Sequence, residues 1–225
     1  MMTRSGNVRS GLPKASALAL AAAAVGATLA LHPAPARAET IVDTWKTVAI
    51  PSPPQLQPVN VQSTQTALLL LDFSEDICTE ARRPSCAHSV PAVAKLLAAA
   101  RAHNMLVVYS TGGKVSPKPV APLAHKGAEP TVQSGVDKFQ GTDLDKILSS
   151  HGIKTVIVTG TSAHGAVLYT ASEAAVRSLE VIVPVDGFSA ESPFAELATA
   201  WLLKNAPASV SAHVTLTSTP QITIR

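Results

Sequence analysis

The sequence predicts a three-layer α/β domain, in which helices cover both faces of a parallel sheet. Four short apolar runs have the length of strands, at residues 66–73, 105–110, 154–160 and 179–185. Runs that are apolar at successive positions are typical of parallel strands buried between two helix layers. Segments of helical character separate these runs, so strands and helices alternate along the chain.

The first helix is expected to begin at Ser89, a residue that favours the N-cap position, with Pro91 in the first turn. Apolar residues then recur at helical spacing to about His103. After the second strand, residues 111–130 are rich in Gly, Lys and Pro and predict a loop. A loop of that length inside a domain is often functional, and the sequence leaves open whether it is a lid.

The later helices have their own start and stop signals. Thr142 and Asp145 predict a capping box at the start of the second helix, and Gly152 predicts its end. Two further helices and a short last strand are expected over residues 164–178, 193–205 and 214–217.

The excess positive charge lies at the beginning of the chain. The 225 residues include 18 basic and 15 acidic ones, which gives a formal charge of +3. Residues 1–38 contain four of the basic residues and no acidic one, so the remainder carries a formal charge of −1. Because binding through phosphates needs a basic surface, this distribution argues against a nucleic-acid partner.

Residues 1–38 have the features of a secretory signal peptide. Met1–Lys14 is polar and positive, residues 15–31 carry no charge, and Ala36-Arg37-Ala38 fits the rule for cleavage after a small residue. The sequence therefore predicts cleavage after Ala38 and a periplasmic or secreted protein. The alternative is an uncleaved membrane anchor, for which an Ala-rich run of this length is short.

The segment after the leader is rich in proline. Pro51, Pro53 and Pro54 favour an extended arm over residues 39–65 that packs on a domain, rather than a helix. Residues 66–225 are then the domain, without a further segment that could span a membrane.

The chain has two cysteines, Cys78 and Cys86, in a polar loop. In an oxidising compartment a local disulfide is the expected state of such a pair. The alternative is a reactive thiol, but the sequence shows no His or carboxylate at a recognisable spacing to activate it.

Three segments at the predicted carboxyl ends of the strands carry the chemistry, because ligands bind at that edge of such sheets. They read LLLDFSED at residues 69–76, FQGTDLDKIL at residues 139–148 and TVIVTGTSAHGAVLYTASEAA at residues 155–175. In this order and spacing they resemble the isochorismatase-like hydrolases, also called cysteine hydrolases. The resemblance implies a flavodoxin-like or Rossmann-like sheet of about six strands and a small-molecule substrate.

The resemblance also implies where catalytic residues belong. The family uses an Asp after the first strand, a Lys before the F-x-G-T-D-L segment and a Cys nucleophile after the third conserved strand. Asp72 matches the first, whereas Gln133 stands at the Lys position and Ala166 at the Cys position. The Asp-x-His metal cluster of nicotinamidases is also missing, so no metal or other cofactor is expected.

A chain of this kind needs a route without a thiol. A methyl group cannot attack a carbonyl carbon, but the backbone N–H groups of Ser162 and Ala166 could still form an oxyanion hole. Isochorismatases cleave a vinyl ether by protonating carbon, and the turn around His164 resembles that of members without the cysteine. Asp72 would act as a general acid if it is buried in apolar surroundings, and as a base if it lies beside Lys138.

Several interpretations of these residues remain open in the sequence. Lys138 replaces the missing lysine from a shifted position, or forms a surface pair with Asp137. Gln133 contacts a substrate or is an ordinary loop residue, and His164 contacts substrate or is structural.

Two functions from different classes fit these observations. The first is an exported hydrolase that acts without a cysteine nucleophile, and the second is an inactive family member that binds a small molecule or partner in the same pocket. The resemblance leaves a homo-oligomer open. Tyr169 and Trp201 are expected to be aromatic residues of the core.

Overall fold

The computed structural model describes residues 39–112 and 118–225, so the predicted signal peptide lies outside the described residues. The chain divides into two units, Met1–Ala49 and Ile50–Arg225. The described end of the first unit contains a single helical turn, α1 (Ile41–Thr44), followed by a 3₁₀ turn. The prediction of an extended arm was wrong for these residues, because the prolines begin only at Pro51 and leave this stretch free to coil.

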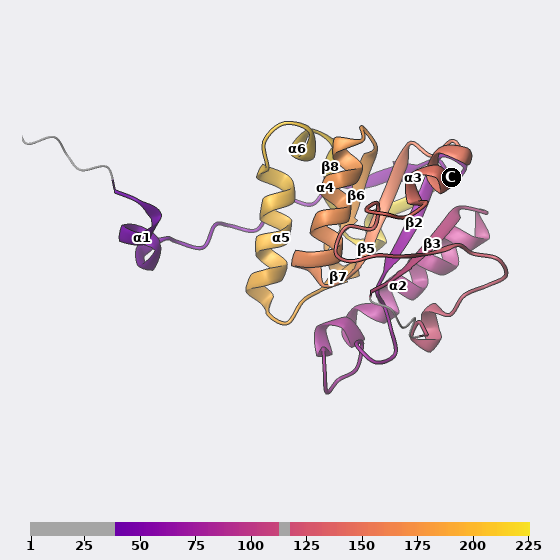
Figure 1. The fold of residues 1–225 in the computed structure, drawn as a ribbon, viewed down its shortest axis with the longest axis horizontal. Helices are drawn as coiled ribbons and strands as arrows, with labels where there is room; N and C mark the ends of the chain where they lie inside the picture. Colours follow the sequence, from indigo (N-terminus) through magenta and orange to yellow (C-terminus); the bar gives the residue numbers. More distant parts are fainter. Residues whose placement is uncertain (1–38, 113–117) are drawn as a thin grey trace, which may run out of the picture. The chain divides into compact units, whose positions relative to one another are not determined.

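The second unit is built on a seven-stranded parallel sheet (Figure 1). Six strands follow one another in the order β4-β3-β2-β5-β6-β8, and the short β7 pairs with β5. Because β2 is the first of these strands in the chain and lies inside the sheet, later strands are added on both sides of it. The strands are β2 (Thr66–Leu71), β3 (Leu106–Thr111), β4 (Thr131–Gln133), β5 (Thr155–Thr161), β6 (Glu180–Pro184), β7 (Phe188–Ser189) and β8 (Val214–Thr217).

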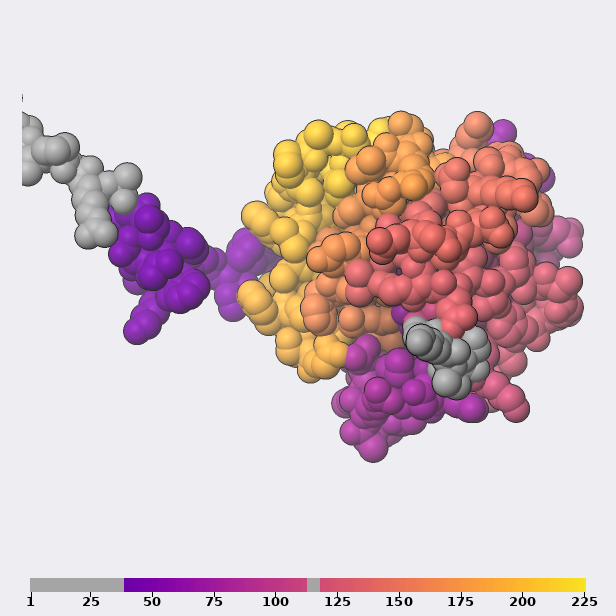
Figure 2. All heavy atoms as spheres, in the orientation of Figure 1, coloured from indigo at the N-terminus to yellow at the C-terminus, as the bar shows by residue number. Residues whose placement is uncertain are grey.

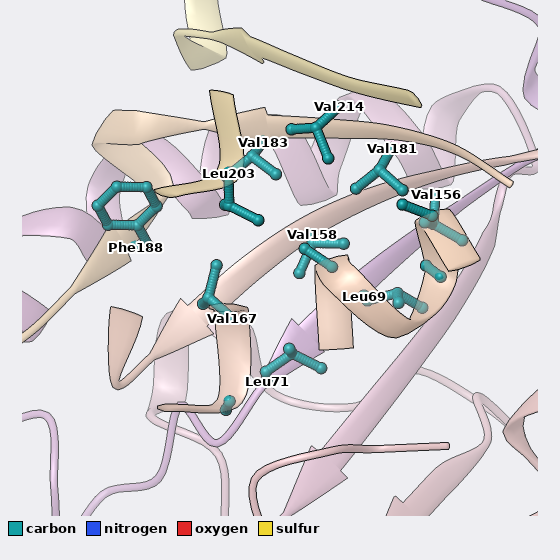
Figure 3. Close-up of a cluster of buried hydrophobic side chains, with 14 of the residues drawn as sticks. Leu69, Leu71, Val156, Val158, Val167, Val181, Val183, Phe188, Leu203 and Val214 are labelled. Atoms are coloured by element: carbon teal, nitrogen blue, oxygen red, sulfur yellow. The ribbon is translucent and has the colours of Figure 1, made fainter. Parts of the chain in front are cut away.

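Helices cover both faces of this sheet, which confirms the three-layer prediction. One face carries α2 (Pro84–Ala102), which packs on Leu68 and Leu70 of β2. Leu69 and Leu71 of β2 lie in the core on the opposite face (Figure 3), which is covered by three helices. These are α3 (Leu144–Ser150), α4 (Leu168–Val176) and α5 (Pro193–Asn205), and a short α6 (Ser209–His213) precedes β8. The alternation along β2 explains its apolar sequence, because neighbouring side chains enter different cores.

A second, two-stranded sheet was not predicted from the sequence. It pairs β1 (Val59–Val61) in parallel with β9 (Ile222–Ile224), at the end of the chain. Val61 is buried in the same core as α2, so part of the predicted arm is a strand of this unit. Local sequence patterns cannot show a pairing between segments so far apart in the chain.

The start of α2 differs from the prediction, because the helix begins at Pro84 rather than after Ser89. Proline is well suited to a first helical position, where its missing N–H would have no partner in any case. Pro91 therefore lies inside the helix, where its ring removes one backbone hydrogen bond.

The predicted capping box at Thr142 does not form. The Thr142 hydroxyl accepts a hydrogen bond from the Leu144 N–H at 3.1 Å and donates to the Lys138 carbonyl at 2.6 Å. Thr142 therefore joins the turn before α3 to the preceding loop. Gly152 follows α3 in a left-handed conformation, with φ of 66°, and ends the helix as predicted.

The expectation of two core aromatics was also wrong. Tyr169 on α4 is 53% exposed and Trp201 on α5 is 39% exposed. Both helices turn their small residues toward the sheet, including Ala171 and Ala200, and leave the large rings outside. Among residues 39–112 and 118–225, no helix is both long and apolar enough to cross a membrane.

Candidate active site

A cavity of about 360 Å³ opens at the carboxyl ends of β2, β3 and β5. Its walls include Asp72 after β2, Ser110 at the end of β3 and Ser162 after β5. The segment between β2 and α2 closes another side, and Figure 2 shows this segment, in purple, projecting at the lower edge of the unit. The cavity therefore lies where the strand order reverses, which is the usual ligand position in such sheets.

Asp72 sits directly after β2 with a positive φ of 58°. This left-handed conformation is uncommon for residues other than glycine, although Asp adopts it more readily than most. The Asp72 backbone N–H donates to the Ser110 carbonyl at 3.2 Å, and the Ser110 hydroxyl donates to Asp72 Oδ1 at 2.8 Å. The end of β3 therefore holds both the backbone and the side chain of Asp72.

Lys138 completes this arrangement as the buried partner of Asp72. Its Nζ donates to Asp72 Oδ2 at 2.8 Å, and the whole residue is 0% exposed. The same ammonium group donates to the carbonyls of Gly135, at 2.7 Å, and Ser134, at 3.3 Å. The three N–H bonds of Lys138 thus have three oxygen partners, all within the protein.

The loop before α3 brings Lys138 into this position through its own polar side chains. The Ser134 hydroxyl contacts the carbonyls of Asp137 and Gln140, each at 2.8 Å. Asp137 Oδ1 accepts a hydrogen bond from the Phe139 N–H at 2.9 Å, so it caps a local turn instead of pairing with Lys138. The alternative of a surface Asp137–Lys138 pair is therefore wrong.

Arg83 is a second cation at the cavity. Its Nη1 donates to Thr161 Oγ1 at 2.6 Å, and its Nη2 forms an ion pair with Glu191. Burial lowers the pKa of the Arg83 guanidinium, and the positive charge of Arg82 lowers it further. Thr161 follows Gly160, which pairs with Leu71 in the sheet, so Arg83 is anchored beside the strand end that carries Asp72.

The two cysteines fix the segment that holds Arg83. Cys78 and Cys86 form a disulfide, with their Cα atoms 4.9 Å apart. The expectation of a local disulfide is confirmed. The bond joins the loop after β2 to the first turn of α2, and the cavity residues Ile77 and Arg83 lie beside its two ends.

The other predicted site residues lie in different places. Ser162 lines the cavity, but His164 does not, and its half-exposed ring lies 3.8 Å from Glu191. Ala166 is 3% exposed and belongs to the core beneath α4, not to the cavity wall. Gln133 is the last residue of β4, also outside the cavity wall. The structure therefore brings Asp72, Lys138 and Ser162 together and leaves the other three aside.

The sequence did not reveal most of the polar residues that line the cavity, among them Ser110 and Arg83. Ser110 lies at the end of a predicted strand, and the parallel register that pairs it with Leu71 was the available signal. Arg83 lies between the cysteines, and only the folded path of that loop shows that it enters the cavity.

Tyr109 supports the site from the α2 side. Burial raises the pKa of Tyr109 to about 12, and the negative charge of Glu129 adds to the effect. The Tyr109 hydroxyl donates to the Leu123 carbonyl at 2.9 Å and accepts from Arg101 at 3.0 Å. This network fixes one wall of the cavity to the loop before β4.

Within residues 39–112 and 118–225, no three His, Cys, Asp or Glu side chains are placed to hold a metal ion. Ser110 and Thr111 stand where the resemblance places the metal-binding cluster of nicotinamidases. Their hydroxyl groups do not supply the carboxylate and imidazole ligands of such a cluster, so these residues do not fit that metal site.

Comparison with known proteins decides the family. The sequence model of the isochorismatase domain matches residues 66–215, from the first strand of the main sheet into its last. The chain belongs to the isochorismatase family. Its fold and its Asp72 position agree with that assignment, while a comparison with curated proteins gives no match.

Solved structures of this family share the fold. An isochorismatase-like hydrolase from Alkaliphilus metalliredigens is 23% identical, with a TM-score of 0.63, over 70% of this chain and 96% of the other. A cysteine hydrolase from Pseudomonas syringae is 22% identical, with a TM-score of 0.62, over 77% and 96%. N-carbamoylsarcosine amidase from Thermoplasma acidophilum is 21% identical, with a TM-score of 0.60, over 69% and 96%.

Proposed function

We propose that this isochorismatase-family protein is an exported hydrolase of a small molecule, in which the Asp72 carboxylate is the general base. One observation carries the proposal: Asp72 faces a cavity at the switch point of the sheet while Lys138 and Ser110 hold both of its carboxylate oxygens. The sequence left acid and base roles open. The contacts with Lys138 and Ser110 favour the base, because N–H and O–H donors bind a carboxylate in its ionised form, and only that form can accept a proton.

The reaction follows from this arrangement. A water molecule in the cavity would give a proton to Asp72 as its oxygen adds to an electrophilic carbon of the substrate. The bond to the leaving group then breaks, and the proton moves from Asp72 to that group. The ammonium of Lys138 has no N–H left for the substrate, so its role is to position and charge-balance Asp72.

A thiol nucleophile has no place in this mechanism. The chain has only two cysteines, and both are in the disulfide. Ala166 offers a methyl group that is buried in the core. The thioester route is therefore closed in the oxidised protein.

Export is part of the proposal. It is supported by the leader sequence and by the disulfide, which is typical of proteins that work in an oxidising compartment.

A second candidate function is binding without catalysis. The buried methyl group of Ala166 favours it, because a site that lost its nucleophile retains the cavity and can still hold a ligand. Turnover separates the two candidates, since a binding protein releases its ligand unchanged.

The test is a hydrolase screen of the purified protein with small amides and esters. We expect Asp72→Asn to lower the turnover of any substrate by about a hundredfold or more, the usual contribution of a general base. Asp145→Asn is the matched control, because Asp145 is an exposed residue of α3 that does not line the cavity. Equal turnover by wild type and Asp72→Asn contradicts the proposal, and ligand binding without turnover by the wild type favours the second candidate.

A further inference from the structure

Three buried polar atoms without a hydrogen-bond partner cluster around the cavity. They are Ser74 Oγ, Thr111 Oγ1 and Arg83 Nε, and among the residues that the structure describes no other buried side-chain nitrogen or oxygen lacks a partner. All three residues line this one cavity. Because a buried polar group without a partner costs free energy, their coincidence at one place indicates a polar ligand that supplies the missing partners.

The charge of Arg83 indicates the sign of that ligand. Its side chain is only 16% exposed, and its Nη1 and Nη2 atoms are engaged by Thr161 and Glu191. The Nε–H remains as a donor on the same planar group. Guanidinium groups bind carboxylates strongly through such N–H bonds, so an acidic group of the ligand is the natural partner.

Glu191 does not already fill this role. Its side chain is 57% exposed, so water screens its charge, and its contact with Arg83 is made at Nη2 and leaves the Nε–H without an acceptor. A ligand carboxylate inside the cavity would meet a less hydrated part of the guanidinium group, where a charged hydrogen bond is stronger.

The hydroxyl groups of Ser74 and Thr111 are suited to the same acidic group. Ser74 is 4% exposed and Thr111 is 7% exposed, and both hydroxyls are donors as well as acceptors. Both residues line the cavity, so a rotation about the Cα–Cβ bond would turn either hydroxyl toward a ligand.

The remaining walls limit the body of the ligand. Leu70, Phe73 and Ile77 give the cavity an apolar part of its lining. A volume of about 360 Å³ is at the lower end for ligand pockets, which fits a compound with one ring or a short chain.

We infer that the substrate or ligand is a small carboxylic acid with an apolar body, whose carboxylate is bound by Arg83 with Ser74 and Thr111. This inference deepens the proposed function, since it places the hydrolysable group of the same molecule at Asp72. Arg83 is then a specificity-determining residue, and Asp72 is the reacting end of the site.

The inference is tested by comparing the binding of one charged compound with the binding of a neutral compound of the same shape. The probes are benzoate and benzamide, which share an apolar ring and differ in charge, and their affinities are measured by NMR titration. We expect the wild type to prefer benzoate, and Arg83→Gln to weaken benzoate binding by about tenfold to a hundredfold, the usual effect of a lost charged hydrogen bond. Benzamide binding should change little in that variant.

The matched control is Arg82→Gln. Arg82 is the neighbouring cation, but its side chain is 61% exposed and pairs with Asp76. Arg82→Gln should bind benzoate like the wild type, and Arg83→Lys should retain part of the preference for benzoate because it keeps the charge. If Arg83→Gln does not fold, Arg83→Lys and the wild-type preference decide the question.

Equal binding of benzoate and benzamide by the wild type, or equal losses in the Arg82 and Arg83 variants, would overturn the inference. The proposed function fails on a different result, because Asp72→Asn should lose turnover and still bind benzoate. Retained turnover in Asp72→Asn together with benzoate selectivity would leave the acid-binding site standing without Asp72 as the base.

Discussion

Replacing Lys138 by Met should destabilise the protein far more than an ordinary lysine replacement. The change removes the ammonium group and keeps an unbranched apolar chain, so the packing around the stem is preserved. Asp72 would lose its charged partner, and the carbonyls of Ser134 and Gly135 would lose their donor. Breaking one side of a buried ion pair typically costs about 3–5 kcal/mol of unfolding free energy.

This cost can be measured by urea denaturation and by thermal unfolding. For a domain of this size, about 3–5 kcal/mol corresponds to a fall in Tm of about 6–20 °C. The control is Lys204→Met, because Lys204 lies exposed in the last turn of α5. The slope of the free energy against urea should stay constant in both variants if only stability changes.

A double variant shows whether the loss of stability in Lys138→Met comes from the unpaired charge of Asp72. Asp72→Asn removes the carboxylate charge, so adding it to Lys138→Met should recover part of the stability. We expect the two changes to be non-additive by about 1 kcal/mol or more, as is usual for residues in contact. A Lys138→Met protein within about 0.5 kcal/mol of Lys204→Met, which is the range of neutral surface changes, would refute the reasoning.

Two further predictions concern other parts of the cavity wall. Because burial raises the folded-state pKa of Tyr109 to about 12, above its usual value of 10, the folded protein holds this proton where the unfolded chain has lost it. Stability should therefore fall between pH 10 and about pH 12, and Tyr109→Phe should flatten this part of a urea-denaturation pH series; an unchanged slope would count against it. Replacing Cys78 and Cys86 by Ser removes a short covalent loop and should cost about 2–3 kcal/mol, measured by urea denaturation. The double serine variant should unfold like the reduced wild type, and a loss in the variant that reduction does not reproduce would show that the disulfide is not its source.

The layers and the central strands could be predicted from the sequence, because a strand that is buried on both faces has a continuous run of apolar residues. Every residue of β2 is buried, and every one of them except Thr66 is apolar. The carboxylate that ends this run was equally visible, since Asp72 interrupts the apolar pattern at the edge where ligands bind. Periodicity and position were sufficient for these features.

The position of Lys138 could be predicted only in part. Lys138 lies only a few residues after Gln133, which stands at the lysine position of the family, and this made it a candidate. The path of the loop decides where its ammonium group lies. That path depends on side-chain hydrogen bonds of Ser134 and Asp137, which no local propensity encodes. Arg83 depends in the same way on how the disulfide-closed segment folds back over the sheet.

Ala166 shows the limit of transferring a family position without its surroundings. The residue follows β5 as expected, within a π-helical turn over Ala163–Val167, but its methyl group packs into the core. An alanine has no polar group that needs the cavity, so the core can take it up at no cost.

The Asp72–Lys138 pair is better explained by chemistry than by stability. A buried ion pair pays a large desolvation cost, and apolar side chains of similar volume often stabilise a core as well or better. Here the pair sits at the edge of a cavity, with its carboxylate 15% exposed and its ammonium fully buried. The lysine is buried and the carboxylate stays accessible to a substrate or a water molecule. A general base needs this arrangement. A purely structural pair would gain nothing from this asymmetry. Both single variants should lose stability, because each breaks the pair, and Asp72→Asn should in addition lose turnover in the protein that remains folded.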